Sequence, residues 1–187
     1  MKHEFRYHLL ASSVTFIIVA IFWVIFKVDT PSILSLFLGI FIGSFILDID
    51  HFLFWFFLKP NLEESRLARA AIRNKDFKSI HKLLKASHQT HHNLIFHHYF
   101  FQVILVLFSF FVFTLTNNTF VTSLVVSLNL HLIIDEVIDY SNNPKTLQKW
   151  LFAREESQLP AKFLNRYIGV FSLFLVIFVI FLIISQL

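Results

Sequence analysis

Five long apolar runs restrict what this chain can fold into. Each run approaches the ~20 residues that a helix needs to cross a ~30 Å hydrocarbon layer. A segment in lipid must also satisfy its backbone hydrogen bonds internally, as a helix does. The runs are Leu9 to Phe26, Ile33 to Leu58, Leu94 to Leu115, Phe120 to Ile138 and Tyr167 to Ile184. We predict an all-α integral membrane bundle of about five transmembrane helices with cytoplasmic amphipathic helices, and residues 1–187 as a single membrane domain.

The composition agrees with a membrane protein and narrows the possible chemistry. Of the 187 residues, 56% are hydrophobic and only 15% are charged, and an ordinary soluble domain carries about 25% charged residues. The chain has no cysteine. Disulfides, thiolate metal sites and cysteine nucleophiles are therefore excluded, and His, Asp and Glu remain as the strong metal ligands. The ten histidines become the informative residues.

The basic residues predict the orientation of the chain in the membrane. Of the 16 Lys and Arg, eight lie between Lys59 and Lys85 and five between Lys145 and Arg166. Because Lys and Arg collect on cytoplasmic loops, we expect the N-terminus inside and the C-terminus outside, in a bacterial-type inner membrane. The first run continues through Asp29 and Pro31 into the second, so we expect it to remain as an anchor and not to be a cleaved signal peptide.

Two of the basic segments also have helical periodicity. Between Asn61 and Ser87, and again from Pro144 to Phe152, apolar residues recur near helical spacing among basic ones. The apolar positions are Leu67, Ala71, Ile80, Leu83 and Leu84 in the first segment and Leu147, Trp150 and Leu151 in the second. We expect amphipathic helices on the headgroups, with Trp150 as an interface anchor and membrane lipids, not nucleic acid, as partners.

Polar residues inside the runs carry the functional hypothesis, because a charge within a span costs a few kcal/mol and needs a partner or a purpose. Three clusters stand out: Asp48, Asp50 and His51; His88, His91 and His92, followed by His97 and His98; and His131, Asp135, Glu136 and Asp139. His131 and Asp135 are four residues apart, as are His88 and His92, so each pair shares a helix face. The predicted topology places all three clusters at one depth in the cytoplasmic half.

Mixed imidazole and carboxylate ligands suit borderline divalent ions. We predict a site for one or two ions, Zn or Mn first, and a buried His–Asp network without metal is the alternative. The predicted ligands are Asp48, His51, His88, His91, His92, His131 and Asp135. The predicted catalytic or orienting carboxylates are Asp50, Glu136 and Asp139. His3, His8 and His81 lie in basic flanks and are expected to be solvated or to face headgroups, and at most one of His97 and His98 is expected to be a ligand.

Three segments resemble a known family. Gly43 to His51 is similar to the Gly-x-x-x-Pro-Asp-x-Asp-His signature of the YdjM-like inner-membrane proteins, a family of metal-dependent hydrolases. His131 to Asp135 resembles that family's His-x-x-x-Asp, and Thr90 to Leu94 resembles its His-Arg-x-x-Thr-His-Ser segment. The match covers most of the chain in motif order, although Leu47 replaces the family's Pro and Gln89 its Arg.

The resemblance implies a membrane-embedded hydrolase. Its ligands would be Asp48, Asp50 or His51, His88, one of His91 and His92, His131 and Asp135. We expect hydrolysis of a phosphoester or related bond in a lipid-linked or amphiphilic substrate at the cytoplasmic face, with Lys85 or Arg154 holding the headgroup.

Two other functions remain open. His88-Gln-Thr-His91-His92 is similar to the H-x-x-H-H box of di-iron membrane hydroxylases and desaturases. A non-enzymatic metal or proton transporter is the other, because ionisable residues within spans also mark ion paths.

Overall fold

The computed structural model describes residues 4–87, 91, 94–153, 155 and 159–186, and in these residues the chain forms helices and no strand. Four helical segments are long and apolar enough to cross a membrane: Arg6–Ile25, Thr30–Leu58, Thr119–Asn142 and Ala161–Ile184. The predicted all-α membrane bundle is confirmed.

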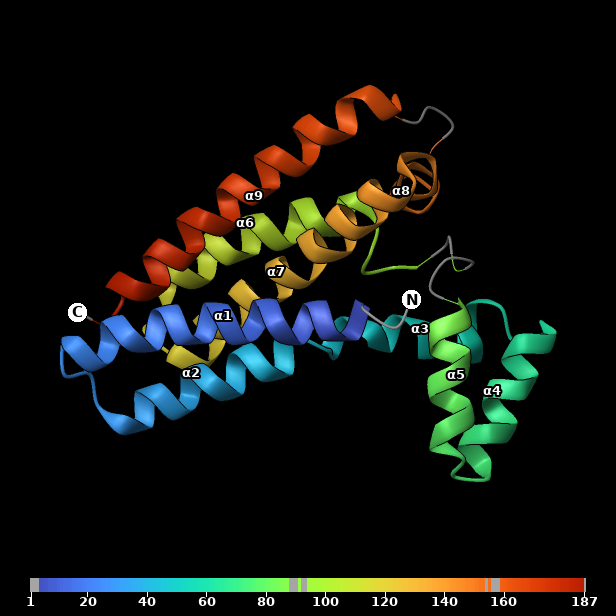
Figure 1. Ribbon diagram of the computed structural model, residues 1–187, viewed down its shortest axis with the longest axis horizontal. Helices are drawn as coiled ribbons and strands as arrows, with labels where there is room; N and C mark the ends of the chain where they lie inside the picture. The colour runs from blue at the N-terminus through green and yellow to red at the C-terminus, as the bar shows by residue number, and fades with distance from the viewer. Residues whose placement is uncertain (1–3, 88–90, 92–93, 154, 156–158, 187) are drawn as a thin grey trace.

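The long helices lie side by side along one direction (Figure 1). They are α1 (Glu4–Ile25), α2 (Thr30–Gly43), α6 (Tyr99–Leu115), α7 (Thr119–Asn142) and α9 (Ala161–Ile184). α7 is the most buried of the four long segments and contacts each of the other long helices. An apolar core that includes Trp23, Val126 and Phe178 joins α1, α7 and α9, so α7 forms the axis around which the bundle packs.

α6 is shorter than the run that predicted it. The run begins at Leu94, but the helix begins at Tyr99 and spans 17 residues, at the lower limit of ~17–25 for a transmembrane helix. His98 caps the helix, since its Nδ1 accepts a hydrogen bond from the Phe100 N–H at 3.3 Å. The preceding residues, His97 among them, therefore lie outside the helix and can reach the other elements.

Small residues set the register between α2 and α7. A Cβ atom on Gly39 would lie 2.0 Å from the Ser123 Oγ, and one on Gly43 would lie 2.5 Å from the Ser127 Cβ. Small residues spaced by four allow two membrane helices to approach this closely. The Ser127 hydroxyl also donates to the Ile40 carbonyl at 2.7 Å. Four residues beyond Ser127, the same face of α7 presents His131 to the end of α2.

The second predicted span is interrupted at that point. α2 ends at Gly43, and the chain continues as a 3-10 turn η1 (Ile46–Asp48), α3 (Ile49–Leu53) and a π-helical segment η2 (Phe54–Leu58). Irregular backbone at membrane depth is tolerated where protein covers it, and Ser44 is 1% exposed. The break turns the Ser44 carbonyl toward His131 and places Asp48 and Asp50 on a new axis.

The predicted amphipathic helices exist as α4 (Glu63–Arg73), α5 (Phe77–Ser87) and α8 (Pro144–Leu151). α4 and α5 stand at one end of the bundle with their axes across the long helices (Figure 1). Their apolar faces pack on Phe54 and Trp55 through Ala68, Ala71 and Ile80. Leu67, which was predicted among the apolar positions, is 54% exposed and is not part of this core.

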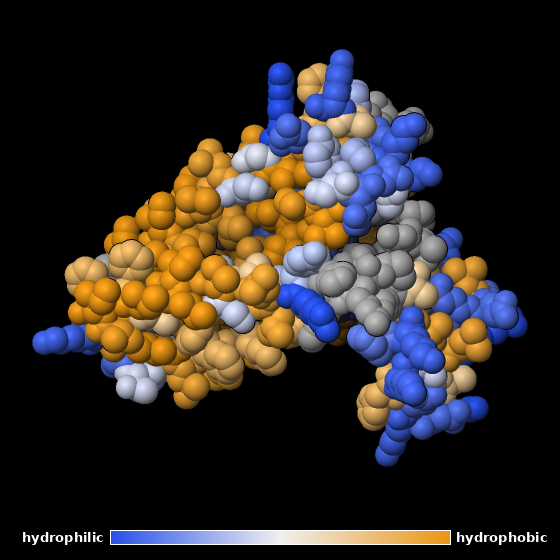
Figure 2. Space-filling model, viewed as in Figure 1, coloured by the Kyte–Doolittle hydropathy of each residue, from blue (hydrophilic) through white to orange (hydrophobic). Residues whose placement is uncertain are grey.

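The prediction that Trp150 anchors α8 in the interface is wrong. Trp150 is buried together with Leu147 and Leu151 against Leu164 and Ile168 of α9. α8 begins one residue after α7 ends and folds back onto the bundle, so its apolar face meets protein. Hydrophobic side chains cover the long helices, and hydrophilic ones gather mainly at the end that carries α4, α5 and α8 (Figure 2).

Candidate metal centre

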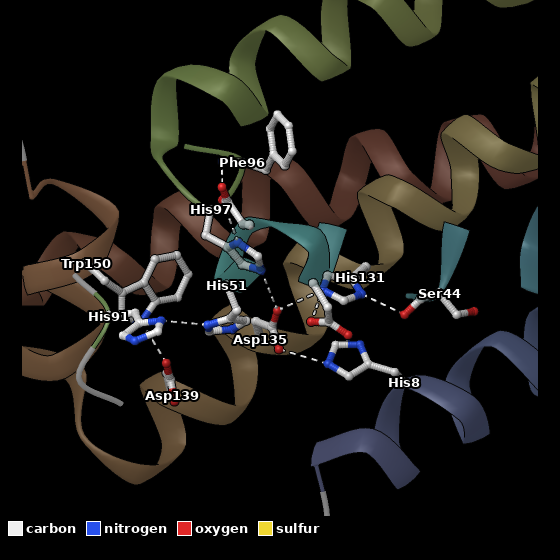
Figure 3. Close-up of polar contacts among 12 residues, drawn as sticks. His8, Ser44, His51, His91, Phe96, His97, His131, Asp135, Asp139 and Trp150 are labelled. Atoms are coloured by element: carbon white, nitrogen blue, oxygen red, sulfur yellow. Dashed lines mark hydrogen bonds and ion pairs between the residues drawn. The ribbon is translucent and has the colours of Figure 1, made fainter. Parts of the chain in front are cut away.

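Five ionisable side chains from four parts of the chain meet inside the bundle, and four of them are labelled in Figure 3. We call them the His/Asp cluster: His8 of α1, Asp48 of η1, His97 before α6, and His131 and Asp135 of α7. They form two overlapping triads, His8–His131–Asp135 and Asp48–His97–His131, each with ligand atoms within 4.8 Å of one another. All are buried except Asp48, whose side chain is 40% exposed. Asp48 therefore forms the open side of the cluster.

Asp135 is the centre of the cluster. Its Oδ1 lies 2.9 Å from the His8 Nε2, and its Oδ2 lies 3.3 Å from the His131 Nε2 and 3.5 Å from the His97 Nε2. The His8 and His131 rings stack at 4.2 Å between centroids. Three imidazoles thus converge on one buried carboxylate.

A hydrogen bond at Nδ1 fixes the orientation and the tautomer of the His131 ring. Nδ1 lies 2.8 Å from the Ser44 carbonyl oxygen, and because a carbonyl only accepts, His131 must donate from Nδ1. In the neutral ring, Nε2 then carries a lone pair directed at Asp135 and at the Asp48 Oδ1, 3.7 Å away. Nε2 is buried and makes no hydrogen bond among the described residues. A lone pair facing two carboxylates is repulsive unless a proton or a metal cation lies between them.

His97 repeats this arrangement with a carboxylate as its outer partner. Its Nδ1 lies 3.3 Å from the Asp50 Oδ2, which also accepts the Phe96 N–H, and its Nε2 faces Asp135. Burial alone would lower the pKa of His97, but the contacts with Asp135 and Asp50 raise it to about 10. Without a metal, this position therefore holds a proton.

These contacts fit a divalent metal ion. Metal-bound histidines donate their other ring nitrogen to a carboxylate or a carbonyl, as His97 does to Asp50 and His131 to Ser44. Two ligands ~2.1 Å from one tetrahedral zinc lie roughly 3.4 Å apart. The separations from the Asp135 Oδ2 to His131 and to His97, 3.3 Å and 3.5 Å, match this spacing.

Two predicted ligands form a separate group beside the cluster. The His51 Nδ1 and the His91 Nδ1 lie 2.9 Å apart, and the His91 Nε2 donates to the Glu64 Oε1 at 2.9 Å. Glu64 also accepts from the Trp55 indole, and the Phe54 ring stacks on His91 at 3.7 Å. We call His51 and His91 the His51/His91 pair. Its centre lies close to the cluster, since the His51 and His97 rings are 6.2 Å apart.

The predicted catalytic carboxylates occupy three different environments. Asp50 is fully buried and holds His97. Asp139 accepts from the Trp150 indole at 2.7 Å. Glu136 is 1% exposed and hydrogen-bonds to Gln102, which also accepts from the Tyr167 hydroxyl.

The structure brings Asp48, His131 and Asp135 of the predicted ligands into one cluster and places His51 and His91 next to it. His88 and His92 lie outside the described residues. Of the two adjacent histidines, His97 joins the cluster and His98 caps α6.

The prediction that His8 is solvated is wrong, because His8 is 6% exposed and contacts Asp135. A signal for it existed in the sequence. His8, Ser12, Val19 and Trp23 follow helical spacing, and all four are buried on one face of α1.

Comparisons of the chain with protein-family models, curated proteins and solved structures found no match.

Proposed function

We propose that this chain is a membrane-embedded metal-dependent hydrolase. Its substrate is a phosphoester or related bond in a lipid-linked or amphiphilic molecule, at the cytoplasmic face of a bacterial-type inner membrane. One observation carries the proposal. In both His97 and His131, Nδ1 contacts a hydrogen-bond acceptor and Nε2 is directed at Asp135. The resemblance of the Asp48 and His131–Asp135 segments to the YdjM-like hydrolases supports the same assignment.

The residues divide into ligands and positioning groups. His8, Asp48, His97, His131 and Asp135 would hold a Zn or Mn ion, and the His51/His91 pair would serve a second ion where two are bound. When bound, such an ion supplies an activated water near neutral pH and polarises a phosphoryl oxygen. The carbonyl of Ser44 keeps His131 in the tautomer that leaves Nε2 available for the metal.

We assign the acid–base work to the carboxylate that hydrogen-bonds neither to a proposed ligand nor to the Trp150 indole. Asp50 holds His97 and Asp139 holds the Trp150 indole, so both act as positioning residues. Glu136 keeps one buried oxygen, Oε2, without a hydrogen bond among the described residues. We assign Glu136 the general-base role.

The substrate part of the proposal rests on location. The cluster lies between spans, in a bundle whose outer surface is apolar (Figure 2). An amphiphile already in the bilayer reaches such a site more easily than a soluble metabolite does. The Lys85 side chain and Arg154, predicted to hold a headgroup, lie outside the described residues.

Metal analysis of the protein purified in detergent tests the proposal. Stoichiometric Zn or Mn, lost in His131→Ala and retained in His81→Ala, together with release of phosphate from phosphatidic acid, is the expected result. His81 is exposed on α5 and serves as the matched control. Two Fe per chain would favour the di-iron oxygenase alternative. If the protein contained no metal and a chelator did not change its melting temperature, the hydrolase proposal would be rejected. A buried proton network or a proton path would then explain the cluster.

A further inference from the structure

A groove of about 640 Å³ runs between α1 and α7. Its volume falls within the ~300–1,000 Å³ of small-molecule sites. Most of its wall is apolar, from Leu10, Ala11 and Val14 on α1 and Ile134, Val137 and Ile138 on α7. Both helices belong to candidate membrane spans. We therefore expect hydrocarbon to border the apolar part of the groove.

The groove adjoins the His/Asp cluster. Its α1 wall starts at Tyr7 and continues at Leu10, and His8 lies between these residues on the same helix. Its α7 wall flanks Asp135 in the same way, with Ile134 before it and Val137 after it. The contact between His8 and Asp135 at 2.9 Å joins the two walls. A molecule in the groove lies against the helices that carry the proposed ligands.

One end of the groove is polar and is followed by basic residues. Tyr7, Ser141 and Asn142 provide a hydroxyl, a second hydroxyl and an amide at this end. Arg6 precedes Tyr7 and is exposed, and Lys145 follows Asn142 after a short connection. An anionic headgroup is the complement of this end, and a hydrocarbon chain is the complement of the rest.

We propose that the groove binds a hydrocarbon chain of a phosphate-bearing lipid and so selects the substrate. The chain lies along Leu10–Val14, and the phosphate lies at the polar end, on the same two helices that carry His8 and Asp135. The identification of this lipid as a substrate rests on the proposed hydrolase function. The groove as a lipid site does not.

Photolabelling of the full-length protein tests the groove directly. The probe is phosphatidic acid with a diazirine in its acyl chain, incorporated into phosphatidylcholine nanodiscs, and crosslinked residues are mapped by mass spectrometry. We expect saturable labelling of the segments Leu10–Val14 and Ile134–Ile138. Unlabelled phosphatidic acid should compete at a concentration at least about tenfold lower than phosphatidylcholine. Labelling that does not saturate, or equal competition by both lipids, would mean annular lipid only and overturn the proposal.

A matched pair of substitutions adds a second measurement. Val14 lines the groove and Val24 lies on the same helix outside it, with exposures of 47% and 64%. Val14→Phe should reduce groove labelling several-fold, whereas Val24→Phe should leave it unchanged. Ala11→Phe provides an independent groove variant. Should neither groove variant fold, the competition experiment on the wild-type protein decides.

The outcomes separate this proposal from the proposed function. His131→Ala should lose the metal but keep groove labelling, because the groove does not include His131. Saturable labelling of a protein that binds no metal would reject the hydrolase and keep the lipid site. A metal-loaded, active protein with an unlabelled groove would reject the lipid site and keep the hydrolase. An unlabelled groove in a protein that elutes as a dimer would show that a second copy covers it.

Discussion

His131 on α7 donates a hydrogen bond from Nδ1 to the backbone carbonyl of Ser44 at 2.8 Å, where small residues bring α2 and α7 together. This contact fixes the tautomer of the neutral imidazole and directs Nε2 at Asp135. The break after α2 and the small residues on α7 both serve this contact. The backbone of one span thus orients a ligand on another.

Loss of His8 should weaken metal binding as a ligand substitution would. His8→Ala removes the nitrogen 2.9 Å from Asp135, so we expect metal affinity to fall at least about tenfold, with His131→Ala and Asp135→Ala stronger still. Competition with a fluorescent zinc chelator measures the change. His81→Ala on exposed α5 is the control. Equal small effects of all four substitutions would contradict the site assignment.

Asp50 should act through His97. Asp50→Asn keeps the side-chain volume but replaces the carboxylate that holds the His97 Nδ1. We expect metal affinity to fall by roughly 10–100-fold without loss of the site, which is the usual effect of removing an outer partner of a metal-bound histidine. Asp29→Asn is the control: Asp29 caps α2 at an exposed position outside the cluster, so its substitution should leave the metal affinity unchanged. An Asp50→Asn protein with wild-type affinity would show that His97 needs no carboxylate partner.

The metal-free protein should lose stability as the pH rises. The pKa of His97 rises from 6.5 to about 10 on folding, since the contacts with Asp135 and Asp50 outweigh burial. A raised pKa in the folded state stabilises the fold fully below pH 6.5, and this contribution disappears as the pH approaches 10. Melting temperatures of the chelator-treated protein should fall over this range.

Metal binding at neutral pH should also release protons, because a metal takes the place of the proton on His97. Calorimetric zinc titrations in buffers of different ionisation enthalpy measure the number released. His97→Gln should release fewer protons and show a flatter pH dependence of melting. If the melting temperature of the metal-free wild type stayed constant between pH 6.5 and 10, the assigned proton would be wrong.

The contact of α2 with α7 should tolerate no added methyl group. A Cβ on Gly39 would lie 2.0 Å from the Ser123 Oγ and 2.6 Å from the Phe120 carbonyl oxygen, and the backbone oxygen cannot move aside as a side chain can. We expect Gly39→Ala to destabilise the fold by about 1–3 kcal/mol, measured by unfolding in detergent.

Gly169 of α9 is the matched control, since nothing lies within 4 Å of its added Cβ. Gly169→Ala should be neutral or stabilising by up to about 1 kcal/mol, through its higher helix propensity. Equal effects at both positions would show that Gly39 matters for propensity and not for packing.

A topology measurement tests the orientation on which the cytoplasmic site depends. A periplasm-active reporter fused after Leu187 should be active, and the same reporter inserted between Arg66 and Lys85 should be inactive. The insertion site should be cytoplasmic because eight of the Lys and Arg residues lie between Lys59 and Lys85. The reverse pattern would move the site to the outer face.

Much of the architecture followed from local patterns. The runs of apolar residues predicted the helices because backbone in lipid must bond to itself. The end of α1, the start of α7 and the end of α9 lie within one residue of the predicted bounds, whereas the other ends of these helices extend four to six residues beyond the apolar runs. The start of α6 could not be read in this way. Leu94 and Phe96 are apolar enough for a span, yet residues 94–98 leave the helix so that the Phe96 N–H and His97 can contact Asp50.

The candidate site was predicted in part. The spacing of His131 and Asp135 by four residues placed them on one face, and their position within a span marked them as functional. His8 was missed because only its basic neighbours were considered, and not the helical spacing that it shares with Ser12, Val19 and Trp23. The separation of the His51/His91 pair from His131 was also hidden, since sequence spacing relates residues on one helix and not on two.

The sequence by itself determined that this chain forms a helical membrane bundle with ionisable residues inside it, because hydrophobic length and helical period are local properties. Only the tertiary structure decided which of those residues meet. The approach of Gly39 and Gly43 to Ser123 and Ser127 fixes the register of α2 on α7, and that register brings Ser44 to His131. The packing of α1 against α7 then brings His8 into contact with Asp135. Such contacts depend on distances between segments up to 127 residues apart, and no pattern within one segment encodes them.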